Sequence, residues 1–361
     1  QARGRSRGHR RAPREMASLR GSVGALRTAG PNAARLTDNA NSVSKRSAVE
    51  AGYYEDPLVA RFANHKRRPS LINRGYWIRF AAMDLVTSWF LDVFGKHGRC
   101  QVLSLGAGFD TAFFRLASER KLPAGLRYFE VDFEATVAEK LELVRADPEL
   151  RALAEGEGPA DAAAAGLPVY SACGVDLRDT GALEAALLGP GGAGLDVAQP
   201  TLLLSEVALT YLPAADVDAL LRWIAERLQR ALVAVYEQVL PSDGFGRVMV
   251  RHFESIESPL LSLPLHPTLQ AQASRHEACG LRPLRALDLN ELLASLDSEV
   301  RRRVFNLEPF DEFEEWRLKC SHYALICSQT PGLFAGQGPA GDGPRQLPLG
   351  PLGQRVEAPR G

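Results

Sequence analysis

The chain has 361 residues, of which 45% are apolar and 24% are charged, with 43 basic and 43 acidic side chains. This composition excludes a mainly disordered chain, a collagen and a disulfide-stabilised miniprotein. No apolar run approaches the roughly 20 residues that a membrane-spanning helix needs, which argues against an integral membrane protein.

Charge is unevenly distributed along the chain. Residues 1–36 hold nine arginines and one acid, a net charge of +8, and residues 331–361 have a net charge of +1, so residues 37–330 carry −9. This acidic body argues against a general basic face for nucleic acid but leaves room for a local basic pocket. We expect a disordered basic segment over 1–36, one folded domain over 37–330 and a disordered, glycine- and proline-rich tail over 331–361.

The N-terminal region lacks the apolar stretch of a secretory signal. We expect a cytoplasmic protein whose natural start is Met16. The alternative is a mitochondrial transit peptide, which the arginine-rich, acid-poor composition also fits. The five cysteines are widely spaced and form no CxxC pair, so we expect reduced thiols and neither a disulfide framework nor a metal site.

Helical and strand patterns alternate through the body of the chain. This alternation predicts an α/β fold: a doubly wound, mostly parallel seven-stranded sheet with helices on both faces and an N-terminal helical extension. The low-complexity segments 154–166 and 189–194 are expected to be surface loops. Predicted helices cover 70–94, 110–121, 133–145, 179–188, 213–228, 244–253 and 268–279. Predicted strands cover 101–105, 127–131, 169–175, 201–205 and 231–236, with late strands near 282–287 and 323–327.

Glycines and acids follow the predicted strands, where ligands bind in such sheets. Gly106 and Gly108 end the first strand and let the backbone approach a ligand closely, although a tight turn without a ligand explains them as well. The third glycine of the dinucleotide fingerprint is absent, which disfavours a nicotinamide enzyme. Asp132 ends the second strand, where a carboxylate would hold a ribose diol; the alternative is a solvated acid or a helix cap.

The third and fourth strands also end in acids. Asp176 would accept from an adenine amino group while Leu177 packs against the ring, and Glu206 follows the fourth strand. Each acid alone is explained by a helix cap or a solvated strand end. Together, the four strand ends predict a rim suited to a nucleoside that bears a positive centre, and the sequence has no phosphate-binding GxxxxGK[ST] loop.

Basic residues precede the sheet in two clusters. We expect Lys45 or Arg79 to pair with a carboxylate of a cofactor or a substrate. Arg74 and Arg79 are five residues apart on a predicted helix and point in different directions, so at least one of them is equally explained as a solvated residue. The histidines form no catalytic arrangement, and His322 is expected to be structural. The segment 308–316 interleaves acids and aromatics, which fits a helix start, a cap on the sheet or the mouth of a pocket.

Seven segments, in order, resemble the leucine carboxyl methyltransferase family of S-adenosylmethionine-dependent enzymes. They span roughly residues 40–328, and their collinear order makes the resemblance specific. The segments are SKRSAVEAGYYEDP (44–57), INRGYWIR (72–79), LSLGAGFDT (103–111), YFEVDF (128–133), GVDLRD (174–179), LLLSEVALTYL (202–212) and YEQV (236–239).

The resemblance implies a role for each matching residue. Lys45 and Arg79 would contact the carboxylate region of S-adenosylmethionine, and Gly106 would lie under its methionine moiety. Asp132 would hold the ribose, Asp176 and Leu177 the adenine, and Glu206 the amino end. No metal and no general base are implied, and Arg74 and Tyr211 are the candidates for pairing with the substrate carboxylate.

The family has two branches with different substrates. One methylates the C-terminal leucine carboxylate of the protein phosphatase 2A catalytic subunit. The other methylates a side-chain carboxylate of the wybutosine precursor in phenylalanine tRNA, and segments 210–212, 236–253 and 307–323 resemble this branch. That branch normally continues into a kelch propeller, which residues 331–361 cannot hold, so a truncated gene model is expected. The rival interpretation is a binding module that has lost activity with its C-terminal domain.

Overall fold

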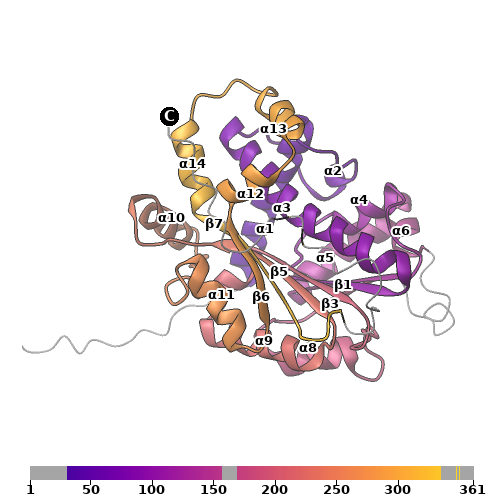
Figure 1. The fold of residues 1–361 in the computed structure, drawn as a ribbon. Coiled ribbons are helices and arrows are strands. Elements are labelled where there is room, and N and C mark those ends of the chain that lie inside the picture. The colour runs from indigo at the N-terminus through magenta and orange to yellow at the C-terminus, as the bar shows by residue number, and fades with distance from the viewer. Residues whose placement is uncertain (1–30, 157–168, 335–346, 348, 350–361) are drawn as a thin grey trace, which may run out of the picture.

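A seven-stranded sheet forms the centre of the described part of the chain (Figure 1). The computed structural model describes residues 31–156, 169–334, 347 and 349. The strands are β1 Cys100–Leu105, β2 Leu126–Asp132, β3 Tyr170–Gly174, β4 Thr201–Glu206, β5 Ala231–Gln238, β6 Arg282–Asp288 and β7 Tyr323–Gln329. They lie in the order β3-β2-β1-β4-β5-β7-β6, and β7 alone runs antiparallel to its neighbours. The predicted doubly wound, mostly parallel sheet is confirmed.

The strand order reverses between β1 and β4. The chain runs outward from β1 through β2 to β3, and then returns to the other side of β1 to build β4 and β5. At such a reversal the connections leave in opposite directions and open a crevice at the carboxyl ends of the strands. Residues that follow β1 to β5 therefore gather at one edge of the sheet.

Helices cover both faces of the sheet. Figure 1 shows α4, α5 and α6 on one side of the strands and α8, α9 and α11 on the other. The helices are α1 Pro31–Glu50, α2 Val59–Phe62, α3 Ser70–Phe94, α4 Ala112–Ser118, α5 Glu134–Ala146, α6 Pro148–Ala154, α8 Thr180–Leu188, α9 Ala214–Arg227, α10 Gly244–Ser255, α11 Leu269–Ala278, α12 Leu289–Ser295, α13 Ser298–Phe305 and α14 Phe313–Ser321. Short 3₁₀ turns, η1 and η2, span Gly95–His97 and Leu209–Tyr211.

Burial on both faces explains why the central strands have continuous apolar sequences. Side chains alternate across a strand, so Val102 and Leu103 of β1 belong to different cores. Val102 shares its core with Trp77 of α3, and Leu103 shares its core with Leu221 of α9. All four side chains are almost fully buried.

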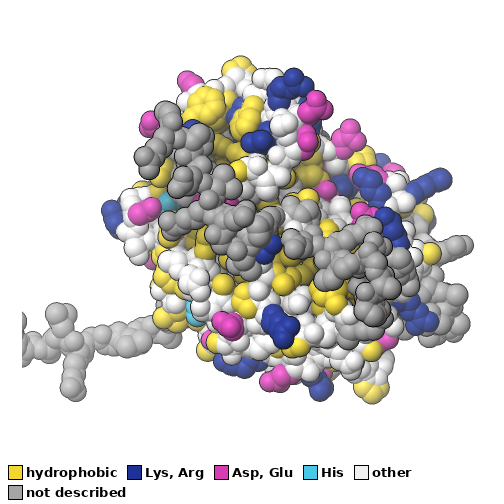
Figure 2. Space-filling model, in the orientation of Figure 1, with side chains coloured by type: hydrophobic (Ala, Val, Ile, Leu, Met, Phe, Trp, Pro, Cys, Tyr) yellow, Lys and Arg dark blue, Asp and Glu magenta, His cyan; other side chains and the backbone are white. Residues whose placement is uncertain are grey.

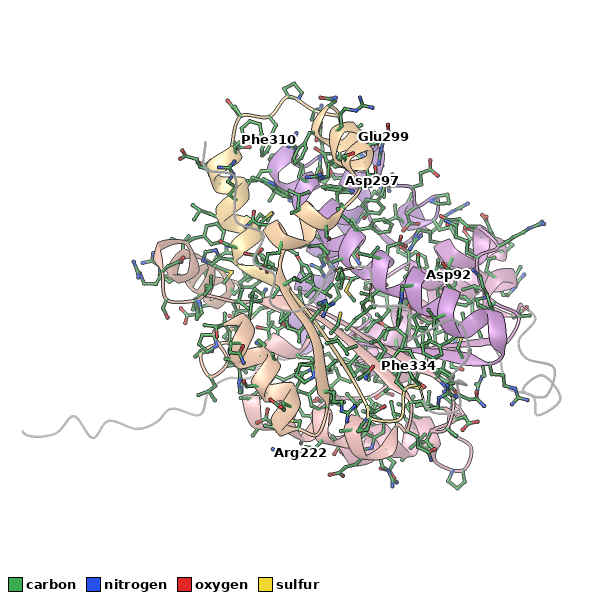
Figure 3. The ribbon with its side chains drawn as sticks, viewed as in Figure 1. Asp92, Arg222, Asp297, Glu299, Phe310 and Phe334 are labelled. Carbon is green, nitrogen blue, oxygen red and sulfur yellow. The ribbon has the colours of Figure 1, made fainter. Side chains whose placement is uncertain are left out.

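The structure describes a few residues of each terminal segment that we expect to be disordered. Helix α1 starts at Pro31, a residue well suited to a first helical turn, so the predicted boundary at residue 36 lies inside a helix. After β7, Leu333 is fully buried and Phe334 stacks on Phe94 with ring centres 5.8 Å apart (Figure 3). Apolar side chains at these few positions suffice to fix the start of a segment whose composition predicted disorder. The rest of both segments, and loop residues 157–166, lie outside the described residues.

Buried His276 makes stability depend on pH. His276 of α11 is 2% exposed, its Nδ1 lies 2.8 Å from the Ser328 hydroxyl, and burial lowers its pKa to about 3. Between pH 6.5 and pH 3, His276 is therefore protonated in the unfolded chain, with an ordinary histidine pKa of about 6.5, but neutral in the folded protein. The contribution of His276 to the free energy of unfolding is complete above pH 6.5 and is lost as the pH falls.

We expect the wild type to lose about 1.4 kcal/mol more stability than His276→Gln when the pH falls from 7.5 to 5.5. Urea unfolding of both proteins at the two pH values measures this difference. Equal pH dependence in both proteins would show that His276 titrates normally in the folded state.

Candidate functional site

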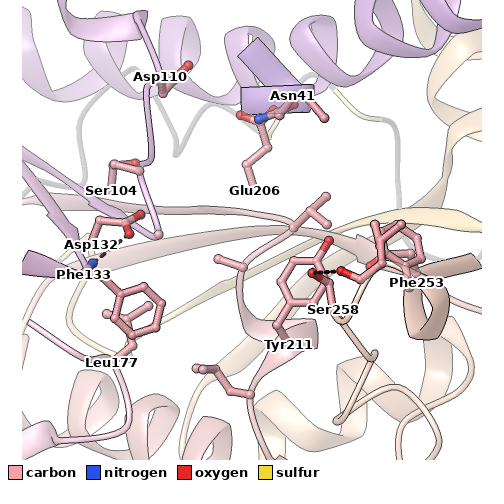
Figure 4. A pocket seen from close by; sticks show the side chains of 18 of the residues that line it. Asn41, Ser104, Asp110, Asp132, Phe133, Leu177, Glu206, Tyr211, Phe253 and Ser258 are labelled. Atoms are coloured by element: carbon pink, nitrogen blue, oxygen red, sulfur yellow. Dashed lines mark hydrogen bonds between the residues drawn. The ribbon is translucent and has the colours of Figure 1, made fainter. Parts of the chain in front are cut away.

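A cavity of about 730 Å³ lies at the carboxyl ends of the strands (Figure 4). This volume is within the range of small-molecule sites. Of the nine residues that the sequence predicted for the site, eight line it, from six separate segments of the chain. They are Lys45, Arg79, Gly106, Asp132, Asp176, Leu177, Glu206 and Tyr211. The ninth, Arg74, does not.

The glycine turn after β1 brings backbone into the cavity. Gly106 and Gly108 have φ angles of +66° and +47°, which favour glycine. A Cβ atom on Gly106 would lie 2.3 Å from the Cβ atom of Ala208, so the turn after β1 packs directly against the turn after β4. No side chain fits at this position, so Gly106 contributes only backbone to the cavity.

Asp132 is fixed by the same turn. Its two carboxylate oxygens accept hydrogen bonds from the backbone N–H of Gly108 at 2.8 Å and of Phe133 at 2.7 Å (Figure 4). Burial raises the pKa of Asp132, and these two hydrogen bonds oppose the rise. A side-chain hydrogen bond from Thr136 adds to these two, so the carboxylate is oriented and keeps acceptor capacity for a further donor.

Asp176 lies on the outer side of the cavity. Its carboxylate accepts from the Arg178 guanidinium at 2.5 to 3.0 Å and from the Arg178 backbone N–H at 3.0 Å, and these hydrogen bonds lower its pKa. Leu177 lies beside it in the cavity wall (Figure 4). Arg178 thus orients Asp176, a partnership that the sequence analysis did not foresee.

Two cations and two carboxylates form a network at the inner end of the cavity. Lys45 Nζ lies 2.9 Å from Asp110 Oδ1 and 3.2 Å from Glu206, and Arg79 also donates to the Glu206 carboxylate. Burial alone would lower the pKa of Lys45 and of Arg79, but the facing carboxylates outweigh burial and raise both values. The network thus pairs two basic side chains with two acidic ones.

Asp110 was missed as a site residue, although it lies in the quoted segment after Gly108. Burial alone would raise the pKa of its carboxyl group, but Lys45 and Lys140 lower it to about 2. Lys140 Nζ also donates to the Asp110 backbone carbonyl at 2.7 Å and to buried Glu130 at 2.5 Å. The signal in the sequence was the acid at the start of a predicted helix, which is also the pattern of an ordinary helix cap.

The turn after β4 brings Tyr211 to the cavity. Glu237, buried in β5, accepts from the backbone N–H groups of Leu209 at 2.9 Å and Thr210 at 3.1 Å, and burial raises its pKa to about 8. Val207 has a φ angle of +55°, an unusual conformation for a β-branched residue. The aromatic ring of Tyr211 lies 6.0 Å from that of Phe253 in α10, at the cavity wall (Figure 4).

Arg74 was predicted to pair with a substrate carboxylate, and its position contradicts that role. It is 1% exposed, and its guanidinium lies 3.8 Å from the ring centre of Phe310 and donates to the Phe305 carbonyl at 3.1 Å. Nearby Glu308 accepts from the Tyr53 hydroxyl at 2.9 Å. These contacts tie α3 to the segment between α13 and α14, where Figure 3 labels Phe310. The segment 308–316 thus holds helices together and does not line the cavity.

The prediction that His322 is structural agrees with its contacts. It is fully buried beneath α10, with Nε2 2.9 Å from Asp243, the residue that caps α10.

Within the described residues, no group of three or more His, Cys, Asp or Glu side chains is placed to hold a metal ion. In the same part of the chain, no helix has the combination of length and apolar character required to cross a membrane.

A sequence model described as leucine carboxyl methyltransferase matches residues 29–225. The human protein named tRNA wybutosine-synthesizing protein 4 is 43% identical over 304 residues, which are 82% of this chain and 44% of that protein. The Arabidopsis thaliana protein named leucine carboxyl methyltransferase 1 homolog is 34% identical over 315 residues, 84% of this chain and 91% of that protein. The chain thus spans less than half the length of the human relative.

The fold also occurs among solved structures. A putative methyltransferase from Thermobifida fusca matches 80% of this chain and 94% of its own, with a TM-score of 0.50 and 14% sequence identity. At this low sequence identity the match shows only that the fold is shared.

The close packing of Gly106 against Ala208 can be tested by substitution. We expect Gly106→Ala to lower the free energy of unfolding by about 3 kcal/mol, from the clash and from the positive φ angle. Adding Ala208→Gly removes the clash and leaves a loss of about 1 kcal/mol. Urea unfolding of the two single variants and the double variant measures the coupling, and strictly additive losses would refute the contact.

Proposed function

Because the chain belongs to the leucine carboxyl methyltransferase family, we propose that it is an S-adenosylmethionine-dependent carboxyl O-methyltransferase. The observation that carries the proposal is the convergence of the strand-end residues in one cavity. Following the strand order, Asp176, Asp132, Gly106 and Glu206 come from the ends of β3, β2, β1 and β4. This row would offer, in order, groups for an adenine, a ribose, a backbone contact and a charged end.

The residues present fit S-adenosylmethionine. Gly106 lines the cavity as backbone alone, since a Cβ atom there would collide with Ala208. Asp132 would accept from the ribose hydroxyls, and Asp176 with Leu177 would hold the adenine. The network of Lys45, Arg79, Asp110 and Glu206 offers both charges that an amino acid end requires, since its cations suit a carboxylate and its carboxylates suit an ammonium group.

When bound, S-adenosylmethionine supplies a methyl group that a carboxylate oxygen can attack, with the thioether as leaving group. A carboxylate is ionised at pH 7, so the protein needs no general base. The task of the chain is to align the two reactants and to remove water from opposite charges that cancel during transfer. The apolar and aromatic wall made by Leu177, Tyr211 and Phe253 suits the exclusion of water.

We propose the wybutosine precursor of phenylalanine tRNA as the substrate that provides the carboxylate. Support comes from the higher identity to the human wybutosine-synthesizing protein than to the Arabidopsis leucine carboxyl methyltransferase homologue. On the face shown in Figure 2, basic and acidic side chains are interspersed, which favours recognition of a local feature over binding by a broad basic face. The alternatives are the C-terminal leucine carboxylate of the protein phosphatase 2A catalytic subunit and an inactive cofactor-binding remnant. A cytoplasmic location stays a prediction.

A methyl-transfer assay with labelled S-adenosylmethionine distinguishes these alternatives. Phenylalanine tRNA with the carboxylate-bearing precursor and phosphatase catalytic subunit ending in leucine are offered in separate reactions. We expect label in the tRNA. Label in the phosphatase alone would assign the other substrate, and cofactor binding without transfer to either would indicate the inactive remnant.

Asp132→Ala tests the cofactor site. We expect the Kd for S-adenosylmethionine to rise roughly tenfold or more, since a lost two-oxygen contact to a ribose is worth about 1.5–3 kcal/mol. Asp92→Ala is the matched control, because Asp92 lies on the surface of α3 and pairs with Lys96 (Figure 3). Calorimetry measures the Kd for S-adenosylmethionine in both variants. Unchanged affinity in Asp132→Ala would show that Asp132 does not bind the cofactor.

A further inference from the structure

The cavity extends beyond the residues assigned to the cofactor. In the strand order, Glu206 ends β4, and the next two strands, β5 and β7, bring Gln238 and Tyr323 to the same edge of the sheet. These two residues face each other directly in the antiparallel pairing of β5 with β7. Since Asp176 to Glu206 account for the adenine, ribose and amino acid parts of the cofactor, the β5–β7 end is the part left for the methyl acceptor.

Gln238 is an unusual residue for this position. It is 1% exposed, and neither polar atom of its amide makes a hydrogen bond of ordinary geometry within the described residues. Leaving a buried amide unpaired costs about 1–3 kcal/mol, so most buried amides have partners. The amide of Gln238 lines the cavity, where a ligand can supply the partners that the chain does not.

The alternation of β5 directs Gln238 toward the side of the sheet on which Arg79 lies. Tyr236 and Gln238 lie on the same face of the strand, and the Tyr236 ring centre is 5.6 Å from the Arg79 guanidinium. Glu237, between them, faces the other way and holds the turn that carries Tyr211. Gln238 therefore faces the same side of the sheet as Arg79, one strand beyond Glu206.

The neighbouring groups are suited to a carboxylate. Tyr76, Tyr211 and Tyr323 line the cavity with Gln238. Burial raises the pKa of Tyr323 to about 12, and the contact of its hydroxyl with the Gln238 amide opposes the rise; burial also raises the pKa of Tyr211 well above its usual value. The phenols of Tyr211 and Tyr323 therefore stay protonated near neutral pH, so they can donate hydrogen bonds and add no negative charge against an anionic substrate.

We propose that Gln238 binds the methyl acceptor, with Nε2 donating to the carboxylate oxygen that is not methylated and Oε1 accepting from an N–H or O–H group beside that carboxylate. An amide that makes no hydrogen bond of ordinary geometry within the described residues, even with the adjacent Tyr323 hydroxyl, matches a ligand that offers an acceptor and a donor side by side. The substrate class is therefore a carboxylate with a neighbouring hydrogen-bond donor. This inference rests on the proposed function and adds the residue that selects the acceptor.

Two substitutions test the role of Gln238. Gln238→Met keeps the shape and removes both polar atoms, and Gln238→Glu places a carboxylate against the substrate carboxylate. The matched control is Gln270→Met, an exposed glutamine on α11. Each protein is saturated with S-adenosylhomocysteine and titrated by calorimetry with precursor-bearing phenylalanine tRNA and, separately, with a peptide ending in leucine.

We expect the Kd of the tRNA to rise tenfold or more in Gln238→Met and further in Gln238→Glu, with the Kd of S-adenosylhomocysteine unchanged within twofold. The difference in tRNA affinity between Gln238→Glu and the wild type should become smaller as the pH falls from 8 to 6, because the protonated carboxyl group regains a hydrogen-bond donor. A merely structural role would not give this pH dependence. The same pattern with the leucine peptide instead would also support a carboxylate site at Gln238.

The inference would be overturned if wild type and Gln238→Met bound the carboxylate ligands with equal affinity. It would also be overturned if the wild type bound neither the tRNA nor the leucine peptide, or if both variants lost S-adenosylhomocysteine binding in parallel. Methyl transfer by the wild type is scored separately. If the wild type transfers methyl groups and the variants bind the carboxylate as well as the wild type does, only the role of Gln238 is refuted. If the wild type transfers no methyl group, the proposed function is refuted, and the comparison of binding affinities still decides on Gln238.

Discussion

The buried charge network of Lys45, Arg79, Asp110 and Glu206 is the interaction on which the site depends. It joins α1, α3, the turn after β1 and the end of β4, segments that are distant in the sequence. Removing one member of such a network leaves another charge buried without a partner, which usually costs more than the network contributes as a whole. The helices that precede the sheet are therefore fixed to the strand ends by the same side chains that suit a charged ligand.

The sheet topology explains why polar groups are concentrated at one edge. Because β1 to β5 are parallel, their carboxyl ends meet there, and the reversal between β1 and β4 leaves this edge uncovered by connections. The glycine turn then lets two backbones come so close that a Cβ atom on Gly106 would collide with Ala208. The polar strand ends, the open crevice and the close approach of two backbone turns thus follow from one arrangement of strands.

The sequence predicted the sheet and α3 from residue 70 to 94, and eight of the nine residues that it assigned to the site line the cavity. Apolar periodicity and strand-end acids are local patterns that a sequence shows directly. The sequence did not predict Arg178 as the partner of Asp176, Asp110 in the charge network or the position of Arg74. The positions of Asp110 and Arg74 depend on which distant segments meet, as when Phe310 comes to lie on Arg74 across more than 200 residues. Arg178 lies only two residues from Asp176, and the sequence pattern does not show that its side chain folds back onto that carboxylate. A buried arginine stacked on aromatic rings and a ligand-binding arginine have the same local sequence pattern, so the fold alone separates them.

Glu237 and Gln238 show how one strand end can serve two purposes. Neighbouring residues on a strand face opposite ways, so Glu237 holds the turn of Tyr211 while Gln238 lines the cavity. The carboxylate is satisfied by backbone N–H groups, whereas the amide, equally buried, has no such partners among the described residues. Stability of the folded chain explains the first residue and does not explain the second. A buried amide that makes no hydrogen bond of ordinary geometry in this part of the chain, even with the adjacent Tyr323 hydroxyl, points to a ligand. The antiparallel β7 strand, by placing Tyr323 opposite Gln238, completes the wall around that position.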